Sequence, residues 1–258
     1  MRFLCLPGAL CNVKADENGY LDFRLILRLT PGPFLSALQK EDHSISFVYT
    51  QGLNPVVISP EFEGFFGPPP NFTFTDSDID GSFMPVRTMG REGNPEDVIR
   101  KFSRTTSLWK DQKPSRALAH LLDLIDQDPE IDGILGFSEG AGIAASLIVE
   151  ENKRQEASGR VPRLKCALFF SGVPPSEADT GRFLLHDEDG TLIHIPTLHV
   201  LGSQDPMIHT TMALYNVCDS DAADLFDHGG GHIIPRDAQT VSELADMVHT
   251  MIADLQQY

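Results

Sequence analysis

Five short apolar segments, each followed by a glycine or serine turn, limit the possible folds of this chain more than any other feature. They are RFLCL (2–6), ISFVYTQG (45–52), GILGFS (133–138), CALFFSG (166–172) and TLHVLGS (197–203). Helical patterns lie between them at 115–127 and 141–154, and another closes the chain at 240–257. Alternating apolar strands and helices are typical of a mostly parallel sheet with helices on both faces. We therefore predict an α/β fold.

The length of 258 residues suits one large domain, and we predict a single domain over 1–258. A stretch at about 54–106 interrupts the alternation with clusters of Pro, Gly and Asn. It carries seven of the sixteen phenylalanines, and six of them, Phe62, Phe65, Phe66, Phe72, Phe74 and Phe83, lie in its first thirty residues. Disordered segments are usually poor in aromatic residues, so we predict an ordered cap or pocket wall. A satellite hydrophobic cluster under a loop is the alternative.

The chain is strongly acidic, with 37 acidic and 20 basic residues and a formal net charge of −17. Such a charge disfavours nucleic acid and anionic membrane surfaces as partners. No run of about 18 apolar residues predicts a membrane span, and the start MRFLCLPG does not resemble a signal peptide. Four cysteines without metal-finger spacing are predicted to be reduced thiols. We expect a cytoplasmic protein and an unused glycosylation sequon at Asn71.

The segment Gly136–Gly140 has the pattern Gly-x-Ser-x-Gly, after an apolar strand and before a helical run. This context is typical of a nucleophile elbow, in which Ser138 takes a strained backbone conformation and the glycines make room for neighbouring elements. The alternative is a turn of small residues that opens a helix packed on a sheet. The strand and helix on either side favour the elbow.

A serine nucleophile needs a base and an acid that orients the base, in the chain order Ser, Asp or Glu, then His. Asp205 follows the apolar strand in VLGSQDPM, although an Asp-Pro pair is also a common turn. His232 ends the glycine run of DHGGGHIIP and is favoured as the base over His228, which precedes that run. Asp224 and Asp227 are weaker acid candidates because they lie so close to the histidine in sequence.

Two backbone N–H groups are expected to stabilise an oxyanion at such a site. One belongs to the residue after the nucleophile, Glu139, and the other to the loop after the first strand, where Ala9 is preferred and Leu10 is next. We predict that substrate contacts come from apolar residues near this site and in the insertion, namely Leu10, Phe62, Phe65, Phe66 and Phe137.

With these residues assembled, the chain resembles the fungal serine hydrolase family of α/β-hydrolases. The segments DGILGFSEGAGIAASL, LHVLGSQDPM and GGGHIIP are similar to the elbow, acid loop and histidine loop of that family. The resemblance implies an α/β-hydrolase fold, with Ser138 as nucleophile, Asp205 as orienting acid and His232 as general base. It also implies an esterase or thioesterase that acts on a polyketide-like acyl chain, which a synthase carrier domain could present.

Three alternatives stay open. The chain could be a general carboxylesterase for small esters, or an acyltransferase that cyclises or releases its substrate with a nucleophile other than water. It could also be a non-catalytic binding protein on a hydrolase scaffold. No cofactor is expected, and the nine histidines are scattered without a HExxH motif, so the sequence predicts no metal site.

Overall fold

The computed structural model describes residues 1–11, 14–15, 21–22, 32–58, 66, 69–75, 92–105 and 113–256. Each predicted apolar segment overlaps a strand of one parallel sheet: β1 (Arg2–Leu6), β4 (Ser46–Tyr49), β7 (Ile131–Phe137), β8 (Cys166–Phe170) and β9 (Thr197–Leu201). A sixth strand, β10 (Ala223–Asp227), was not predicted. The spatial order is β10-β9-β8-β7-β1-β4, and every pairing is parallel. The predicted α/β class is confirmed.

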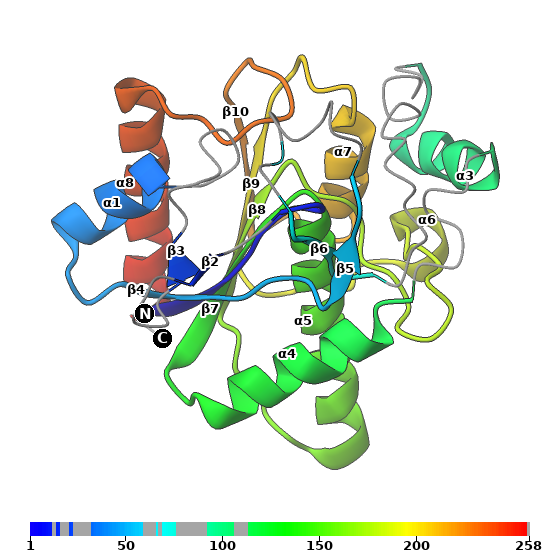
Figure 1. Cartoon of the computed structure of the whole chain (residues 1–258), viewed down its shortest axis with the longest axis horizontal. Coiled ribbons are helices and arrows are strands. Elements are labelled where there is room, and N and C mark those ends of the chain that lie inside the picture. The colour runs from blue at the N-terminus through cyan, green and yellow to red at the C-terminus, as the bar shows by residue number, and fades with distance from the viewer. Residues whose placement is uncertain are drawn as a thin grey trace.

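Side chains of successive strand residues enter two different cores, as the alternation along a strand requires. In β1, Phe3 and Cys5 join one hydrophobic cluster, whereas Leu4 and Leu6 join the other. Helices α1 (Gly32–Glu41) and α8 (Ala238–Leu255) cover the first face. The second is covered by α4 (Ser115–Gln127), α5 (Glu139–Ser158) and α7 (Ile208–Asn216), as Figure 1 shows.

The three predicted helices are present, with small differences at their ends. The helix predicted at 115–127 has those bounds, and the one predicted at 141–154 lies inside the longer α5. The last helix begins two residues earlier than predicted. No helix in the described ranges is long and apolar enough to cross a membrane.

The predicted insertion at about 54–106 is described only in part. Strands β5 (Asn54–Val56) and β6 (Asn71–Thr73) pair antiparallel, and α3 (Pro95–Thr105) follows. Phe62, Phe65 and Phe83 lie outside the described residues. The other short elements are β2 (Lys14–Ala15) and β3 (Leu21–Asp22), which pair with each other, and α6 (His186–Asp189).

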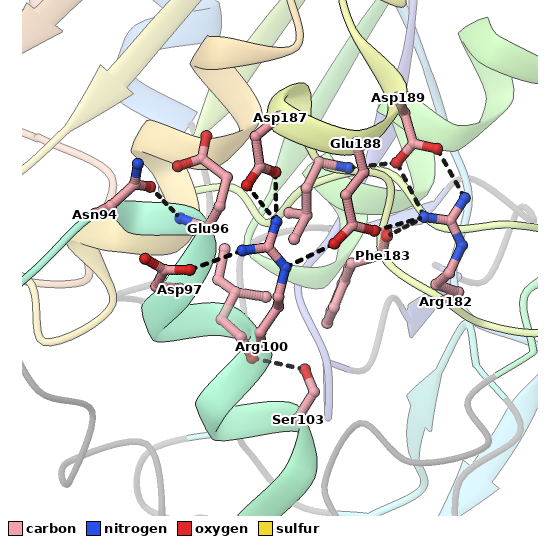
Figure 2. A network of polar contacts seen from close by, with 12 residues as sticks. Asn94, Glu96, Asp97, Arg100, Ser103, Arg182, Phe183, Asp187, Glu188 and Asp189 are labelled. Atoms are coloured by element: carbon pink, nitrogen blue, oxygen red, sulfur yellow. Dashed lines mark hydrogen bonds and ion pairs between the residues drawn. The ribbon is translucent and has the colours of Figure 1, made fainter.

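Helix α3 is docked on the body of the protein by apolar and ionic contacts. Val98 and Phe102 pack against Met207, which lies beside the acid loop. Figure 2 shows that the Arg100 guanidinium donates hydrogen bonds to the carboxylate of Asp97 on its own helix and to those of Asp187 and Glu188 on α6. At the start of α3, the Asn94 side chain accepts a hydrogen bond from the Glu96 N–H at 2.9 Å. This part of the insertion is therefore fixed to α6 and to the acid loop.

All four cysteines are free and buried, as predicted for reduced thiols. Asn71, the residue of the predicted unused sequon, is fully buried in β6. Its side-chain amide donates a 2.8 Å hydrogen bond to the backbone carbonyl of Leu10. The residue therefore has a structural role inside the fold.

Candidate active site

Ser138 stands between the end of β7 and the first residue of α5, at the carboxyl edge of the sheet. Its backbone has φ 54° and ψ −118°, a conformation that residues other than glycine rarely adopt and that costs of order 1–3 kcal/mol. Strain of this kind persists only where the surroundings enforce it. Here the strand and the helix on either side force a sharp turn that presents the hydroxyl outside the sheet.

The glycines on either side of Ser138 are required by close backbone contacts. A Cβ on Gly136 would lie 2.4 Å from the Ala141 Cα, and one on Gly140 would lie 2.3 Å from the Pro7 carbonyl oxygen. Both contacts are with backbone atoms, which cannot rotate away as a side chain could. The Gly-x-Ser-x-Gly pattern thus lets the first turn of α5 pack tightly against β7 and the loop after β1.

Asp205 is held in the loop after β9, with its side chain buried. Its Oδ1 accepts a 2.8 Å hydrogen bond from the Met207 N–H, and its Oδ2 lies 2.7 Å from the His232 Nδ1. Burial is the largest influence on the pKa of Asp205 and raises it, but the contacts with His232 and Met207 outweigh burial and lower the pKa below its usual value. Asp205 is therefore held as a carboxylate that can orient an imidazole.

His232 lies in the loop that joins β10 to α8, between Asp205 and Ser138. Its Nε2 is 3.0 Å from the Ser138 Oγ, while its Nδ1 faces Asp205. The ring also packs at a tilt against the Phe137 ring, with 5.1 Å between centroids. With a proton on Nδ1 directed at the carboxylate, Nε2 is free to accept the serine proton. The arrangement can thus activate a hydroxyl.

The other histidine and acid candidates do not reach the hydroxyl of Ser138. His228 Nδ1 accepts a hydrogen bond from the Gly230 N–H at 3.2 Å, and burial lowers the pKa of His228. The Asp227 carboxylate accepts bonds from the N–H groups of Ser203 and Gly229, so it shapes the loops around the acid. Asp224 lies exposed on β10. The structure brings His232 and Asp205 to Ser138 instead.

The loop after β1 passes directly beside Ser138. A Cβ placed on Gly8 would lie 3.3 Å from the Ser138 Cβ, and Ala9 and Leu10 follow at once. Leu10 has a left-handed φ of 62° and is buried. On the other side of Ser138, Glu139 begins α5, where backbone N–H groups point away from the helix and favour negative charge. These are the positions from which we predict the oxyanion donors.

The Glu139 side chain has a role that the sequence did not reveal. Its carboxylate accepts hydrogen bonds from the backbone N–H groups of Phe74 and Thr75 and from the Thr75 hydroxyl, at 2.9–3.2 Å. Burial raises the pKa of Glu139, and these hydrogen bonds oppose that effect. The partners are 64 and 65 residues away in sequence, so no local pattern could have indicated the contact.

The predicted substrate residues fall into two groups. Leu10, Phe66 and Phe137 are buried members of the cluster between the sheet and α1 and α8. Phe62 and Phe65 lie outside the described residues. A cavity of about 330 Å³ lies elsewhere, between α3 and α6, and does not include Ser138, Asp205 or His232. Its lining includes Ile99, Arg100, Arg104, Arg182, Phe183 and Leu185.

One cluster in the described part of the chain could hold a metal ion. It consists of Glu41, Asp246 and His249, whose ligand atoms lie within 4.8 Å of one another. None of these residues takes part in the hydrogen bonds that join Ser138, His232 and Asp205. His249 Nδ1 is 3.3 Å from a Glu41 carboxylate oxygen. We assign this cluster no part in the candidate site.

The glycine at 202 holds the acid loop against the histidine loop, and this contact is testable. A Cβ on Gly202 would lie 2.1 Å from the Gly230 carbonyl oxygen. We expect Gly202→Ala to lower the free energy of unfolding by about 1–3 kcal/mol and to lower kcat by moving Asp205 relative to His232. Urea unfolding checks this. The control is Gly32→Ala, since a Cβ there meets nothing within 4 Å. Equal unfolding free energies for the two variants would contradict the prediction.

The amino-acid sequence of the chain is similar to those of known proteins. The family model described as Serine hydrolase (FSH1) matches residues 1–244. Esterase FPY3 of Fusarium mangiferae is 34% identical over 262 residues, which cover 98% of this chain and 97% of that protein. Hydrolase phiM of Talaromyces stipitatus is 31% identical over 144 residues, which cover 54% of this chain and 57% of that protein.

Among solved structures, that of esterase PE8 matches with a TM-score of 0.51 and 15% sequence identity, over 97% of this chain and 92% of that one. This likeness concerns the fold, and it confirms the predicted α/β-hydrolase architecture. The family match covers most of the chain. The chain therefore belongs to the serine hydrolase (FSH1) family, as the resemblance of its motifs predicted.

Proposed function

We propose that this member of the serine hydrolase (FSH1) family hydrolyses an acyl ester or thioester, with Ser138 as nucleophile, His232 as general base and Asp205 as orienting acid. The observation that carries the proposal is the continuous pair of hydrogen bonds from Ser138 through His232 to Asp205, at 3.0 and 2.7 Å. Three residues far apart in sequence meet in the order of contacts that serine hydrolysis needs.

The proposed reaction has two halves with the same proton carrier. Ser138 Oγ attacks the carbonyl carbon while its proton passes to His232 Nε2, and Asp205 stabilises the imidazolium. The N–H groups of Glu139 and of Ala9 or Leu10 hold the oxyanion. Collapse of this intermediate expels the alcohol or thiol, which takes the proton from His232 and leaves an acyl-serine. Water then attacks the acyl-serine and gives one proton to His232. When this second intermediate collapses, the acid departs and His232 returns the proton to the Ser138 Oγ.

For the substrate, we propose a polyketide-like acyl chain, carried as a thioester on a synthase carrier domain. The support is the resemblance to the fungal family and the phenylalanine-rich insertion, whose side chains would exclude water from a long apolar chain. Burial of each additional methylene contributes about 0.8 kcal/mol, or roughly fourfold in rate if the contact is made in the transition state. Substrate length is therefore the sharpest variable to test.

The test compares p-nitrophenyl esters with N-acetylcysteamine thioesters of the same acyl chains, from two to twelve carbons. We expect kcat/KM to rise by at least about tenfold with chain length and the thioester to be preferred over an oxygen ester of similar leaving-group reactivity. Equal turnover of short activated esters, without preference for thioesters, would instead identify a small-ester carboxylesterase.

Mass spectrometry of the products in ¹⁸O-labelled water separates the remaining alternatives. Hydrolysis incorporates one labelled oxygen into the acid, whereas cyclisation or acyl transfer releases the thiol without label in the acyl product. A fluorophosphonate probe tests for any catalysis, because it reacts with activated serines. Ligand binding without labelling of Ser138 would indicate a non-catalytic protein.

A further inference from the structure

We propose that residues 71–75, which we name the β6 brace, set the spacing between the two proposed oxyanion donors, with Asn71 and Glu139 as positioning residues. The inference rests on the proposed function, because it concerns how that site is held in its working geometry. One end of the brace is bonded to the loop after β1, and the other end is bonded to the residue that follows Ser138.

The first end of the brace holds a strained loop. The Asn71 amide donates to the Leu10 carbonyl at 2.8 Å, and the Phe72 N–H donates to the Cys11 carbonyl at 3.1 Å. Leu10 has a left-handed φ of 62°, which is unfavourable for a leucine. Such a conformation persists only where neighbouring contacts over-determine it. Asn71, fully buried, supplies such a contact and so fixes the loop that carries the N–H groups of Ala9 and Leu10.

The second end of the brace is fixed to the nucleophile turn. The N–H groups of Phe74 and Thr75 and the Thr75 hydroxyl all donate to the Glu139 carboxylate. Charge-assisted hydrogen bonds of this kind are stronger than neutral ones. The same residue provides the proposed backbone donor next to Ser138. A shift of Phe74 and Thr75 would therefore pull on the residue whose N–H faces the oxyanion.

The middle of the brace has little freedom to move. A Cβ on Gly52 would lie 2.1 Å from the backbone of Thr73, so the chain after β4 presses directly on β6. The Thr73 hydroxyl also donates to the Thr75 carbonyl at 3.0 Å, which fixes the turn between the two ends. A short, confined segment bonded at both ends acts as a spacer of constant length. The brace therefore keeps the N–H group of Glu139 at a constant distance from the N–H groups of the loop after β1.

The competing explanation is that Asn71 and Glu139 only stabilise the fold and do not position the oxyanion donors. Two control variants on α5 separate these explanations. Asn71→Ala removes the hydrogen bonds that the side-chain amide donates to the carbonyls of Leu10 and, more weakly, Phe66. Asn152→Ala removes a hydrogen bond of the same type, to the Leu192 carbonyl, far from Ser138. Glu139→Ala removes a carboxylate that accepts from two successive N–H groups. Glu151→Ala does the same for Arg163 and Leu164. Loss of stability alone would affect both members of each pair.

We expect Asn71→Ala and Glu139→Ala to lower kcat by about 10- to 100-fold with KM within about twofold, since misplacing an oxyanion donor weakens only the transition state. The two control variants should keep kcat within about twofold. Glu139→Gln retains one acceptor oxygen and should give an intermediate kcat. Steady-state kinetics with the preferred ester and thermal unfolding of each variant provide these values.

A second readout isolates the oxyanion. In a thiono ester, sulfur replaces the carbonyl oxygen and accepts hydrogen bonds weakly, so loss of a donor costs this substrate little. The ratio of oxo to thiono kcat/KM should fall in Asn71→Ala by about the factor lost in kcat. An unchanged ratio, or equal losses in the controls, would overturn the brace. If Asn71→Ala does not fold, Glu139→Gln decides by the same ratio. Inactive wild-type protein would instead overturn the proposed function.

Discussion

Replacing Ser138 with alanine is expected to lower kcat by about 10⁵- to 10⁶-fold, because the covalent route needs the Oγ that His232 deprotonates. The residual rate would come from substrate binding and the oxyanion donors alone. Stability should change by less than about 0.5 kcal/mol, since alanine keeps the same backbone and removes only one partly exposed hydroxyl. Steady-state kinetics and thermal unfolding of the purified variant measure both quantities.

The control for this variant is Ser158→Ala at the far end of the same helix, where the hydroxyl donates to the Arg154 carbonyl. It should retain wild-type kcat and wild-type labelling by a fluorophosphonate. Ser138→Ala should not be labelled. If Ser138→Ala kept more than about 1% of the wild-type kcat, the assignment of the nucleophile would be wrong, whatever the probe labels.

The strands of the sheet could be predicted because their signals are local. Buried parallel strands are continuous apolar runs, and the segments at 133–138 and 166–172 have that composition. The missed strand, β10, lies at the edge of the sheet beside β9. Its sequence ADLFD has acidic residues at two of five positions, and Leu225 is exposed. An edge strand needs fewer apolar residues, so its pattern is weaker.

Helix α3 was missed although its start has clear local signals. Asn94 precedes Pro95, and Glu96 and Asp97 follow in the first turn, which is typical of a helix N-terminus. The prediction treated 54–106 as one irregular insertion because of its glycines, prolines and phenylalanines. Composition over a long window concealed a short element. Its docking by Arg100 to α6 depends on residues nearly ninety positions away, which a single sequence does not connect.

The candidate site divides in the same way. Ser138 and Asp205 each follow a predicted strand, and parallel strands bring their carboxyl ends to one edge. His232 follows the missed strand β10, so it was proposed from chain order and from its place at the end of a glycine run. The side-chain contacts of Asn71 and Glu139 follow from no such rule. They join a short antiparallel pair to two loops, and register and loop path are set by tertiary packing.

Replacing Asp205 with asparagine is expected to lower kcat by about 10³- to 10⁴-fold. An amide can still accept from the Met207 N–H through its oxygen, but its NH₂ then faces the His232 Nδ1. To accept a hydrogen bond from this NH₂, the Nδ1 must be unprotonated, so the imidazole carries its proton on Nε2. Nε2 is the nitrogen that must accept the serine proton. The variant therefore keeps its shape and loses the correct tautomer.

Asp227→Asn is the matched control, because that carboxylate also accepts backbone N–H bonds in the loops near His232. It should keep kcat within about threefold, since it does not touch the imidazole. A loss in Asp227→Asn as large as that in Asp205→Asn would move the orienting role to Asp227. Pre-steady-state kinetics with a p-nitrophenyl ester should show a slower acylation burst only in Asp205→Asn.

The difference in unfolding free energy between wild type and Asp205→Asn should depend on pH. The pKa of Asp205 is lowered in the folded protein, so ionised Asp205 favours the folded state. That contribution is fully present above the usual aspartate pKa of about 3.9 and is lost as pH falls through the lower folded value. Wild type should therefore exceed Asp205→Asn in unfolding free energy at pH 7, and the difference should shrink below about pH 4. A difference that grew on acidification would mean that Asp205 is not held as a carboxylate.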